Sequence, residues 1–217
     1  MSETSAGPAR PETVPLRDGS SLRIRAIRPE DKGAIAEGFE RMSPASRYRR
    51  FFAPLRELSE DDLAYLTEVD HHDHEALIGF DVETRDPVGV ARYIRSLEPT
   101  EAEVAVTVID DWQGRGAATA LLEHLVRRAR EAGIEHFVAA VLPDNRDALE
   151  LFRHLAPDGS TERHTTSGLV EFLIEVPETP RPGELPPESA LARALRGAAH
   201  SALEINPWRL IRRRIHR

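Results

Sequence analysis

The 217-residue sequence contains no cysteine, which excludes disulfide bonds, thiolate metal sites and a cysteine nucleophile. It also has no apolar run close to the roughly twenty residues that a membrane-spanning helix requires. Residues 1–15 lack the apolar core of a secretory signal peptide. We therefore expect a cytoplasmic protein without stable membrane insertion.

Lysine is almost absent as well, because Lys32 stands alone against 28 arginines. The net charge of −8 argues against general nucleic-acid binding. This charge is unevenly distributed: residues 177–217 contain eight arginines and four glutamates, so they carry +4 and the remainder of the chain carries −12. We expect an acidic main domain, a basic C-terminal segment and no nucleic-acid partner.

Composition divides the chain into three parts. Residues 1–15 are polar and contain prolines, which predicts a disordered leader. Residues 16–176 are long enough to bury one full core. Residues 177–217 begin with five prolines within eleven residues, which predicts a linker followed by a basic tail. The tail is either unstructured or docks on a partner, an oligomer mate or an anionic lipid surface.

Hydrophobic periodicity predicts about six to seven strands, interspersed with helices, in the main domain. Two serines mark helix starts: Ser43 precedes Pro44, and Ser59 stands three residues before Asp62. This mixture predicts an α/β (α+β) fold. Strands are expected at residues 16–27, 76–83, 88–97, 101–108, 134–142, 161–166 and 169–176. Helices are expected near residues 35–42, 44–52, 60–69, 118–129 and 148–155.

Residues 101–130 read as a strand, a glycine-rich turn and a long amphipathic helix. Gly114 and Gly116 permit a positive φ and a close approach of the backbone to an anion. The start of the helix supplies unpaired N–H groups, and Arg115 adds a positive charge. The alternative is a strand-to-helix turn without any ligand. In the strand, one face carries Ala102, Val104, Val106 and Val108, and the other carries Glu101, Glu103, Ala105 and Thr107.

The turn Gln113-x-x-Gly116-x-Ala118 resembles the acetyl-CoA diphosphate loop of the GNAT N-acetyltransferases. A dinucleotide fingerprint would require an acidic residue after the next strand, where this chain has Leu142-Pro143. Three other stretches narrow the resemblance to the catalytic domain of bacterial Pat-type protein lysine acetyltransferases, over about residues 16–176. They are Leu16-Arg17-Asp18-Gly19, Ile27-Arg28-Pro29-Glu30-Asp31 and Ser43-Pro44-x-Ser46-Arg47-Tyr48-x-x-Phe51-Phe52.

The resemblance implies a mixed, twisted central sheet, flanked by helices, that splays open between the strands at 101–108 and 134–142. Acetyl-CoA would enter this gap as a co-substrate, and no metal is expected. Asn145 would contact the CoA chain, although a capping or turn role for it is equally open. The implied cofactor-binding residues are Val106, Val108, Gln113, Gly114, Arg115, Gly116, Ala117, Ala118, Thr119 and Asn145.

Transfer of an acetyl group to an amine requires that the amine be neutral, whereas a lysine ammonium titrates near ~10.4. Glu103 matches the catalytic glutamate of lysine-acetylating family members, and we expect it to act as the general base. Glu101 lies on the same face of the strand and is the second candidate for the base. Alternatively, Glu103 is a solvated carboxylate on the strand without a catalytic role. Family members often carry a tyrosine acid where this chain has Phe152, so no tyrosine acid is predicted.

Three functions therefore remain open. The leading hypothesis is direct acetyl transfer from acetyl-CoA to the ε-amine of a protein lysine, in a ternary complex. The second is acetylation of a small amine, which the acidic main domain would suit. The third is a catalytically silent acetyl-CoA sensor that acts through protein contacts.

Two charged clusters also admit alternatives. Arg47, Arg49 and Arg50 form either a solvated basic face or a lid that meets an acidic partner surface. Residues 70–75 read Asp-His-His-Asp-His-Glu, all of them residue types that can bind metals. Contiguous residues rarely converge on one ion, so we expect a polar loop there and no metal site.

Overall fold

The structure is a computed structural model, and it describes residues 11–145, 149, 161–164 and 168–176. Its strands are β1 (Glu12–Pro15), β2 (Ser21–Ala26), β3 (His74–Asp81), β4 (Pro87–Arg95), β5 (Glu101–Val108), β6 (His136–Val141), β7 (Thr161–His164) and β8 (Val170–Glu175). Its helices are α1 (Lys32–Glu40), α2 (Pro44–Phe51), α3 (Glu60–Thr67) and α4 (Ala117–Glu131), with short 3-10 turns at Pro29–Asp31 and Asp110–Trp112.

These strands form a single eight-stranded sheet in the order β1-β2-β3-β4-β5-β6-β8-β7. Neighbours are antiparallel except β5 and β6, which are parallel. The expected α/β class and mixed sheet are confirmed. The sheet has one strand more than expected because residues 12–15, assigned to a disordered leader, pair with β2 as β1. That part of the leader prediction is wrong.

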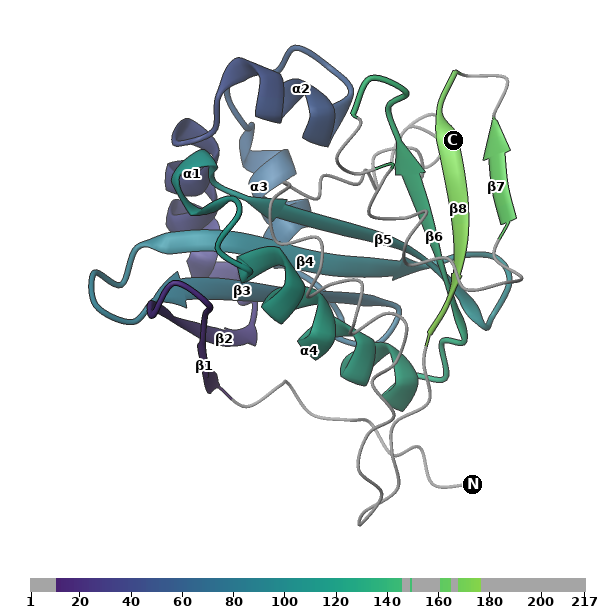
Figure 1. The fold of residues 1–217 in the computed structure, drawn as a ribbon, viewed down its shortest axis with the longest axis horizontal. Coiled ribbons are helices and arrows are strands. Elements are labelled where there is room, and N and C mark those ends of the chain that lie inside the picture. Colours follow the sequence, from purple (N-terminus) through teal and green to yellow (C-terminus); the bar gives the residue numbers. More distant parts are fainter. Residues whose placement is uncertain (1–10, 146–148, 150–160, 165–167, 177–217) are drawn as a thin grey trace.

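The sheet splays open at its centre, between β5 and β6. The two strands pair only from Glu101↔His136 to Glu103↔Val138, although β5 continues to Val108 and β6 to Val141. Figure 1 shows β5 running across the molecule while β6 and β8 turn away from it. The gap expected between these strands is thus confirmed.

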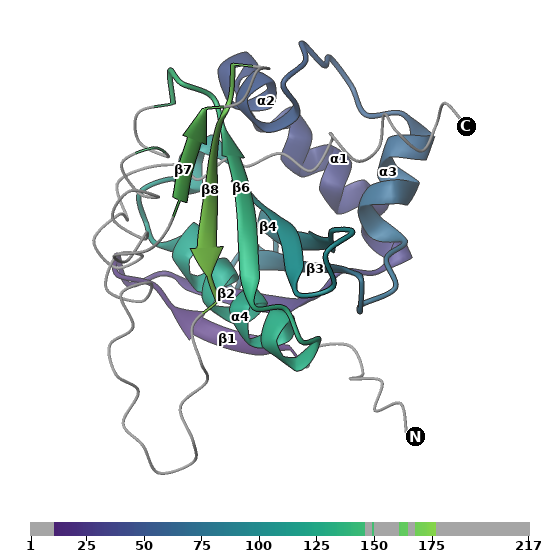
Figure 2. The ribbon, with the colours of Figure 1, turned by 90° about the vertical axis from the view of Figure 1, so that its right-hand side faces the viewer.

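Helices cover both faces of the sheet. α1, α2 and α3 lie on one face and α4 lies on the other (Figures 1 and 2). The valine face of β5 shares a buried cluster with Leu121 and Leu125 of α4, as its alternation predicted. α4 packs closely on β4 because Gly89 has no side chain: a Cβ there would lie 3.2 Å from Leu121 and 2.5 Å from the Thr107 carbonyl.

The predicted helix-start signals are confirmed. The Ser43 hydroxyl accepts a hydrogen bond from the Ser46 N–H at 3.2 Å and caps α2. Ser59 and Asp62 form a capping box at α3, with each side chain accepting from the backbone N–H of the other. The strands expected at residues 76–83 and 88–97 pair antiparallel as β3 and β4, and those expected at 161–166 and 169–176 pair antiparallel as β7 and β8.

A buried carboxylate, Glu75, joins β3 to the end of α4. Its side chain is fully buried and contacts Nε of Arg128 at 2.9 Å and Nδ1 of His71 at 2.7 Å, and it accepts from the N–H of Ala76 at 2.9 Å. The neighbouring Asp70 accepts three backbone N–H bonds and closes the loop before β3. The 70–75 cluster is therefore engaged within the fold, and no group of described residues has metal-binding geometry.

None of the helices in the described part of the chain has the length and apolar character needed to cross a bilayer.

Candidate active site

The main chain of β5 borders the gap. Ile109 N donates to Val88 O at 2.9 Å, and alternation along an antiparallel ladder makes the odd-numbered residues of β5 bond to β4. The peptide groups of Val106 and Val108 therefore point the other way, toward the gap that β6 leaves open. Both residues are among those that the family resemblance implies for cofactor binding.

The turn between β5 and α4 has the conformation that its glycines predicted. Gly114 has φ of 76° and Gly116 has φ of 97°, both in the left-handed region that favours glycine. α4 begins immediately after Gly116, and no side-chain hydrogen bond caps it. A Cβ on Gly116 would meet no atom within 4 Å. The first-turn amides of α4 therefore have no side-chain cap at Gly116, and there is open space beside this glycine, as an anion site at a helix N-terminus requires.

Two side chains of this turn are engaged within the protein itself. Gln113 Nε2 donates to Val108 O at 3.3 Å and to Asp110 Oδ1 at 3.4 Å. The Arg115 guanidinium lies 4.9 Å from the centre of the Trp112 indole and 3.6 Å from the Asp18 carboxylate. Both side chains brace the turn, and Asp18 offsets part of the positive charge that Arg115 was expected to add.

The remaining predicted cofactor residues fall into two places. Ala117, Ala118 and Thr119 form the first turn of α4, with Ala117 buried and the other two half-buried. Asn145 follows the end of β6 and is buried. Its carbonyl accepts from Leu149 N at 3.0 Å. The sites therefore flank the gap from two elements, α4 and the end of β6.

Glu103 occupies the vertex of the gap. It is half-buried, lies opposite Ile94 of β4, and is the last residue of β5 that pairs with β6. Beyond it the two strands part. Glu101, the second candidate, pairs with His136 two residues further from the opening. Phe152 stands where family members often carry a tyrosine acid, and it lies outside the described residues.

The arginine cluster of α2 was interpreted either as a solvated basic face or as a lid, and neither interpretation accounts for all three arginines. Arg47 is not a solvated cation, because its guanidinium donates to the carbonyls of Phe39, Glu40, Met42 and Arg56 at 3.0 to 3.1 Å. It also stacks 4.3 Å from the Phe39 ring centre. Arg50 is only 4% exposed. Arg47 thus joins α1, α2 and the following loop, and Arg50 faces the interior, which a solvated basic face does not explain.

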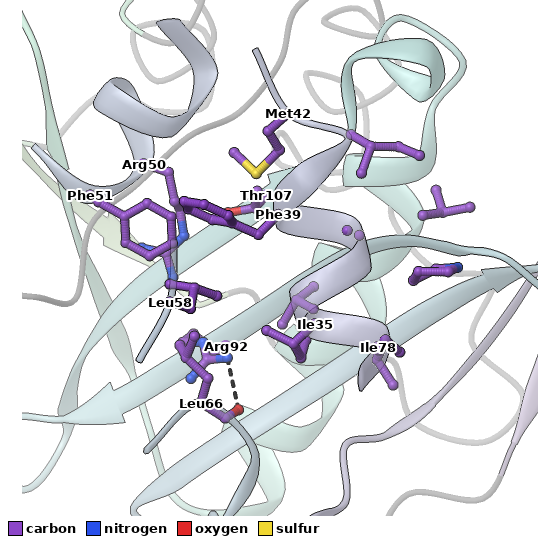
Figure 3. Close-up of a pocket in the computed structure, with 17 residues that line it drawn as sticks. Ile35, Phe39, Met42, Arg50, Phe51, Leu58, Leu66, Ile78, Arg92 and Thr107 are labelled. Atoms are coloured by element: carbon purple, nitrogen blue, oxygen red, sulfur yellow. Dashed lines mark hydrogen bonds between the residues drawn. The ribbon is translucent and has the colours of Figure 1, made fainter. Parts of the chain in front are cut away.

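A pocket between α1, α2, α3 and the sheet was not anticipated from the sequence (Figure 3). It lies against the face of β4 and β5 to which Glu103 belongs. Arg92 lines it and is 2% exposed. The sequence does contain a signal for a buried arginine here, because Val88, Val90 and Ile94 occupy the same face of β4 at period two and Arg92 interrupts them.

The chain matches a protein-family model described as the acetyltransferase (GNAT) family over residues 40–156. It belongs to the GNAT acetyltransferase family. This confirms the resemblance based on residues 113–118 and identifies the protein as an N-acetyltransferase.

Individual relatives agree. The chain is 33% identical over 156 residues to Acetyltransferase PA5475 of Pseudomonas aeruginosa, covering 68% of this chain and 83% of that protein. It is 32% identical over 168 residues to Acetyltransferase Pat of Mycolicibacterium smegmatis, covering 77% of this chain and 49% of that protein. The crystal structure of the GNAT domain of S. lividans PAT superposes with a TM-score of 0.68 at 35% identity, over 76% of this chain and 96% of that chain.

Proposed function

We propose that this GNAT enzyme transfers an acetyl group from acetyl-CoA to the ε-amine of a protein lysine, with Glu103 as the general base. The observation that carries the proposal is the position of Glu103, a half-buried carboxylate at the vertex where β5 and β6 part. The likeness to Pat proteins supports a protein lysine as the acceptor.

The residues around the gap fit a thioester of CoA. The peptide group of Val106 and the N–H of Val108 would bond the pantetheine arm along the edge of β5 that β6 leaves open, while Gln113 holds the Val108 carbonyl. The diphosphate would lie at the N–H groups of residues 114–119, where the positive end of α4 favours an anion. Asn145 would contact the CoA chain from the end of β6. Acetyl-CoA supplies the activated acetyl group as a co-substrate.

Glu103 would then remove a proton from the incoming lysine ammonium, directly or through a water. The neutral amine would form the new N–C bond as the C–S bond breaks, and the thiolate of CoA would leave with the electron pair of that bond. The second proton of the amine nitrogen would pass to the thiolate or to water, which leaves a neutral amide. The gap holds the two reactants together, which converts an encounter of two molecules into a reaction within one complex. Since the chain contains no cysteine, we expect direct transfer rather than an acyl-cysteine enzyme.

The test is thiol release from acetyl-CoA by the purified protein, with whole-cell protein extract and, separately, a panel of small amines as acceptors. Release with proteins, together with acetyl-lysine on a discrete band, is the expected result. Faster release with a small amine would instead establish the small-amine activity. Binding of acetyl-CoA without release from either acceptor set would favour the sensor function.

The glycines at the two ends of α4 provide a matched test of the diphosphate site. Gly116 and Gly133 have φ of 97° and 74°, and a Cβ at either meets no atom within 4 Å. Alanine at either position therefore introduces a similar strain of about 1 kcal/mol. We expect Gly116→Ala alone to raise the KM for acetyl-CoA about tenfold, because the displaced amides bond a charged group.

Steady-state kinetics with both variants measures this difference. Equal KM values for Gly116→Ala and Gly133→Ala would show that the diphosphate does not bind at the start of α4.

A further inference from the structure

Arg92 carries an unneutralised charge in the interior of the protein. Its Nη2 donates to Leu66 O at 3.0 Å and its Nη1 lies 3.2 Å from Nε2 of His74. Burial and the nearby Arg92 lower the pKa of His74 to about 3, so the imidazole is neutral at physiological pH and accepts the bond. Neither partner of the guanidinium is therefore an anion.

Among the described residues no carboxylate forms an ion pair with Arg92, although this residue is 2% exposed. Burial lowers the pKa of Arg92 to about 10, which still leaves it protonated at neutral pH. An isolated charge in a protein interior is costly, and buried charges are ordinarily paired. An anion bound beside Arg92 would relieve this cost.

The pocket beside Arg92 has a volume of about 60 Å³. Since a single water occupies roughly 10–15 Å³ on this measure, the pocket has room for several waters or a small organic acid. Two polar atoms in its lining, Arg92 Nε and Thr107 Oγ1, are buried without a hydrogen-bond partner in the described part of the chain. A second buried arginine, Arg50, also lines the pocket. The remaining walls are mainly apolar (Figure 3) and include Ile35, Phe39, Met42, Leu58, Leu66 and Ile78.

We propose that this pocket binds the carboxylate of a short aliphatic acid of roughly two to four carbons, with Arg92 Nε and Thr107 Oγ1 as its donors. The charged carboxylate accepts both bonds, and the aliphatic chain packs on the apolar walls. A phosphate fits this pocket less well, because its additional charge and oxygens would lie against walls that are mainly apolar.

The carboxylate has two possible sources, a free acid or an acid group carried by an amine acceptor. An acid group on the amine acceptor could reach this pocket, because Thr107 lies on the same face of β5 as Glu103, four residues further along the strand. In either case the site is distinct from the backbone edge of β5 and from the turn at residues 113–119. Arg92 and Thr107 would bind a carboxylate whether or not a protein lysine is the acceptor.

The first experiment measures binding of sodium butyrate by calorimetry and thermal unfolding, in the absence of acetyl-CoA. Sodium chloride controls for ionic strength and butyramide for the aliphatic chain. We expect saturable binding of butyrate only, weakened about tenfold or more by Arg92→Met and about three- to tenfold by Thr107→Val. The exposed strand residue Thr13 provides a control, because Thr13→Val makes the same chemical change away from the pocket.

Thr107→Val keeps the side-chain shape and removes a hydroxyl without a partner, so it decides the outcome even where Arg92→Met fails to fold. Butyrate binding no stronger than that of butyramide would overturn the proposal, as would equal butyrate affinity in wild type and Thr107→Val.

The second experiment identifies the source by comparing 4-aminobutyrate with butylamine, both for binding and as acceptors. Preference for 4-aminobutyrate that Thr107→Val abolishes assigns the carboxylate to the acceptor. Butyrate binding without that preference assigns it to a free acid. Because the binding arms need no acetyl transfer, their result is independent of whether the proposed lysine acetylation is correct.

Discussion

Replacing Glu103 with glutamine is expected to lower kcat by about 10²-fold or more, with little change in the affinity for acetyl-CoA. Glutamine preserves the size of the side chain at the vertex of the gap but cannot take a proton from the lysine ammonium. The cofactor contacts proposed at Val106, Val108 and residues 113–119 do not involve this side chain. Initial rates at saturating acceptor, with acetyl-CoA affinity measured by calorimetry, separate the two effects.

Glu101→Gln is the matched control. Glu101 lies on the same face of β5 and is also half-buried, but it pairs with His136 on the closed side of the vertex. We expect its kcat to stay within about threefold of wild type. An unchanged rate for Glu103→Gln would remove Glu103 from the mechanism, and a large loss for Glu101→Gln would transfer the role to Glu101.

Truncation of Glu75 is expected to have the largest effect on stability. Glu75→Ala should lower the free energy of unfolding by about 3–5 kcal/mol, because it leaves the Arg128 charge without its buried partner. The pair joins the start of β3 to the last turn of α4 through a bond of 2.9 Å. Urea unfolding followed by circular dichroism measures the change.

Glu131 offers a control on the same arginine. It pairs with Nη1 of Arg128 from the surface, with 53% of its side chain exposed. Exposed ion pairs contribute only about 0–1 kcal/mol, so Glu131→Ala should be nearly neutral. Similar losses for the two variants would show that the buried carboxylate is not what stabilises this junction.

The Glu75 contribution should also depend on pH. Burial alone would raise the pKa of its carboxyl, but hydrogen bonds from His71 and Arg128 hold that pKa below the ordinary value of 4.5. Its contribution is therefore complete above about pH 4.5 and is lost as the pH falls through the lowered pKa. The stability difference between wild type and Glu75→Ala should shrink in that acidic range and stay constant above it.

The central part of the fold could be predicted from sequence because its signals are local. The alternation at residues 102–108, the glycines at 114 and 116 and the caps at Ser43 and Ser59 each specify a backbone conformation within a few residues. The gap between β5 and β6, in contrast, was predicted only from the family resemblance. Nothing in the periodicity of either strand indicates where their pairing stops.

The features that the sequence did not reveal depend on distant partners. β1 is a strand because Glu12 to Pro15 lie beside β2, and its four residues carry little periodicity of their own. Arg47 looked solvated because its acceptors are backbone carbonyls of α1 and a later loop. Arg92 and Thr107 become neighbours of one pocket only when α1, α2 and α3 cover the sheet.

Hydrogen–deuterium exchange with and without acetyl-CoA tests the proposed site most directly. We expect slower exchange at the amides of Val106 and Val108, and at residues 114–119, when acetyl-CoA is bound. The segment that follows the C-terminal end of α4, around Gly133, should not change. Protection elsewhere with none at β5 and the start of α4 would contradict the account, because the acetyl group would then not be presented at Glu103.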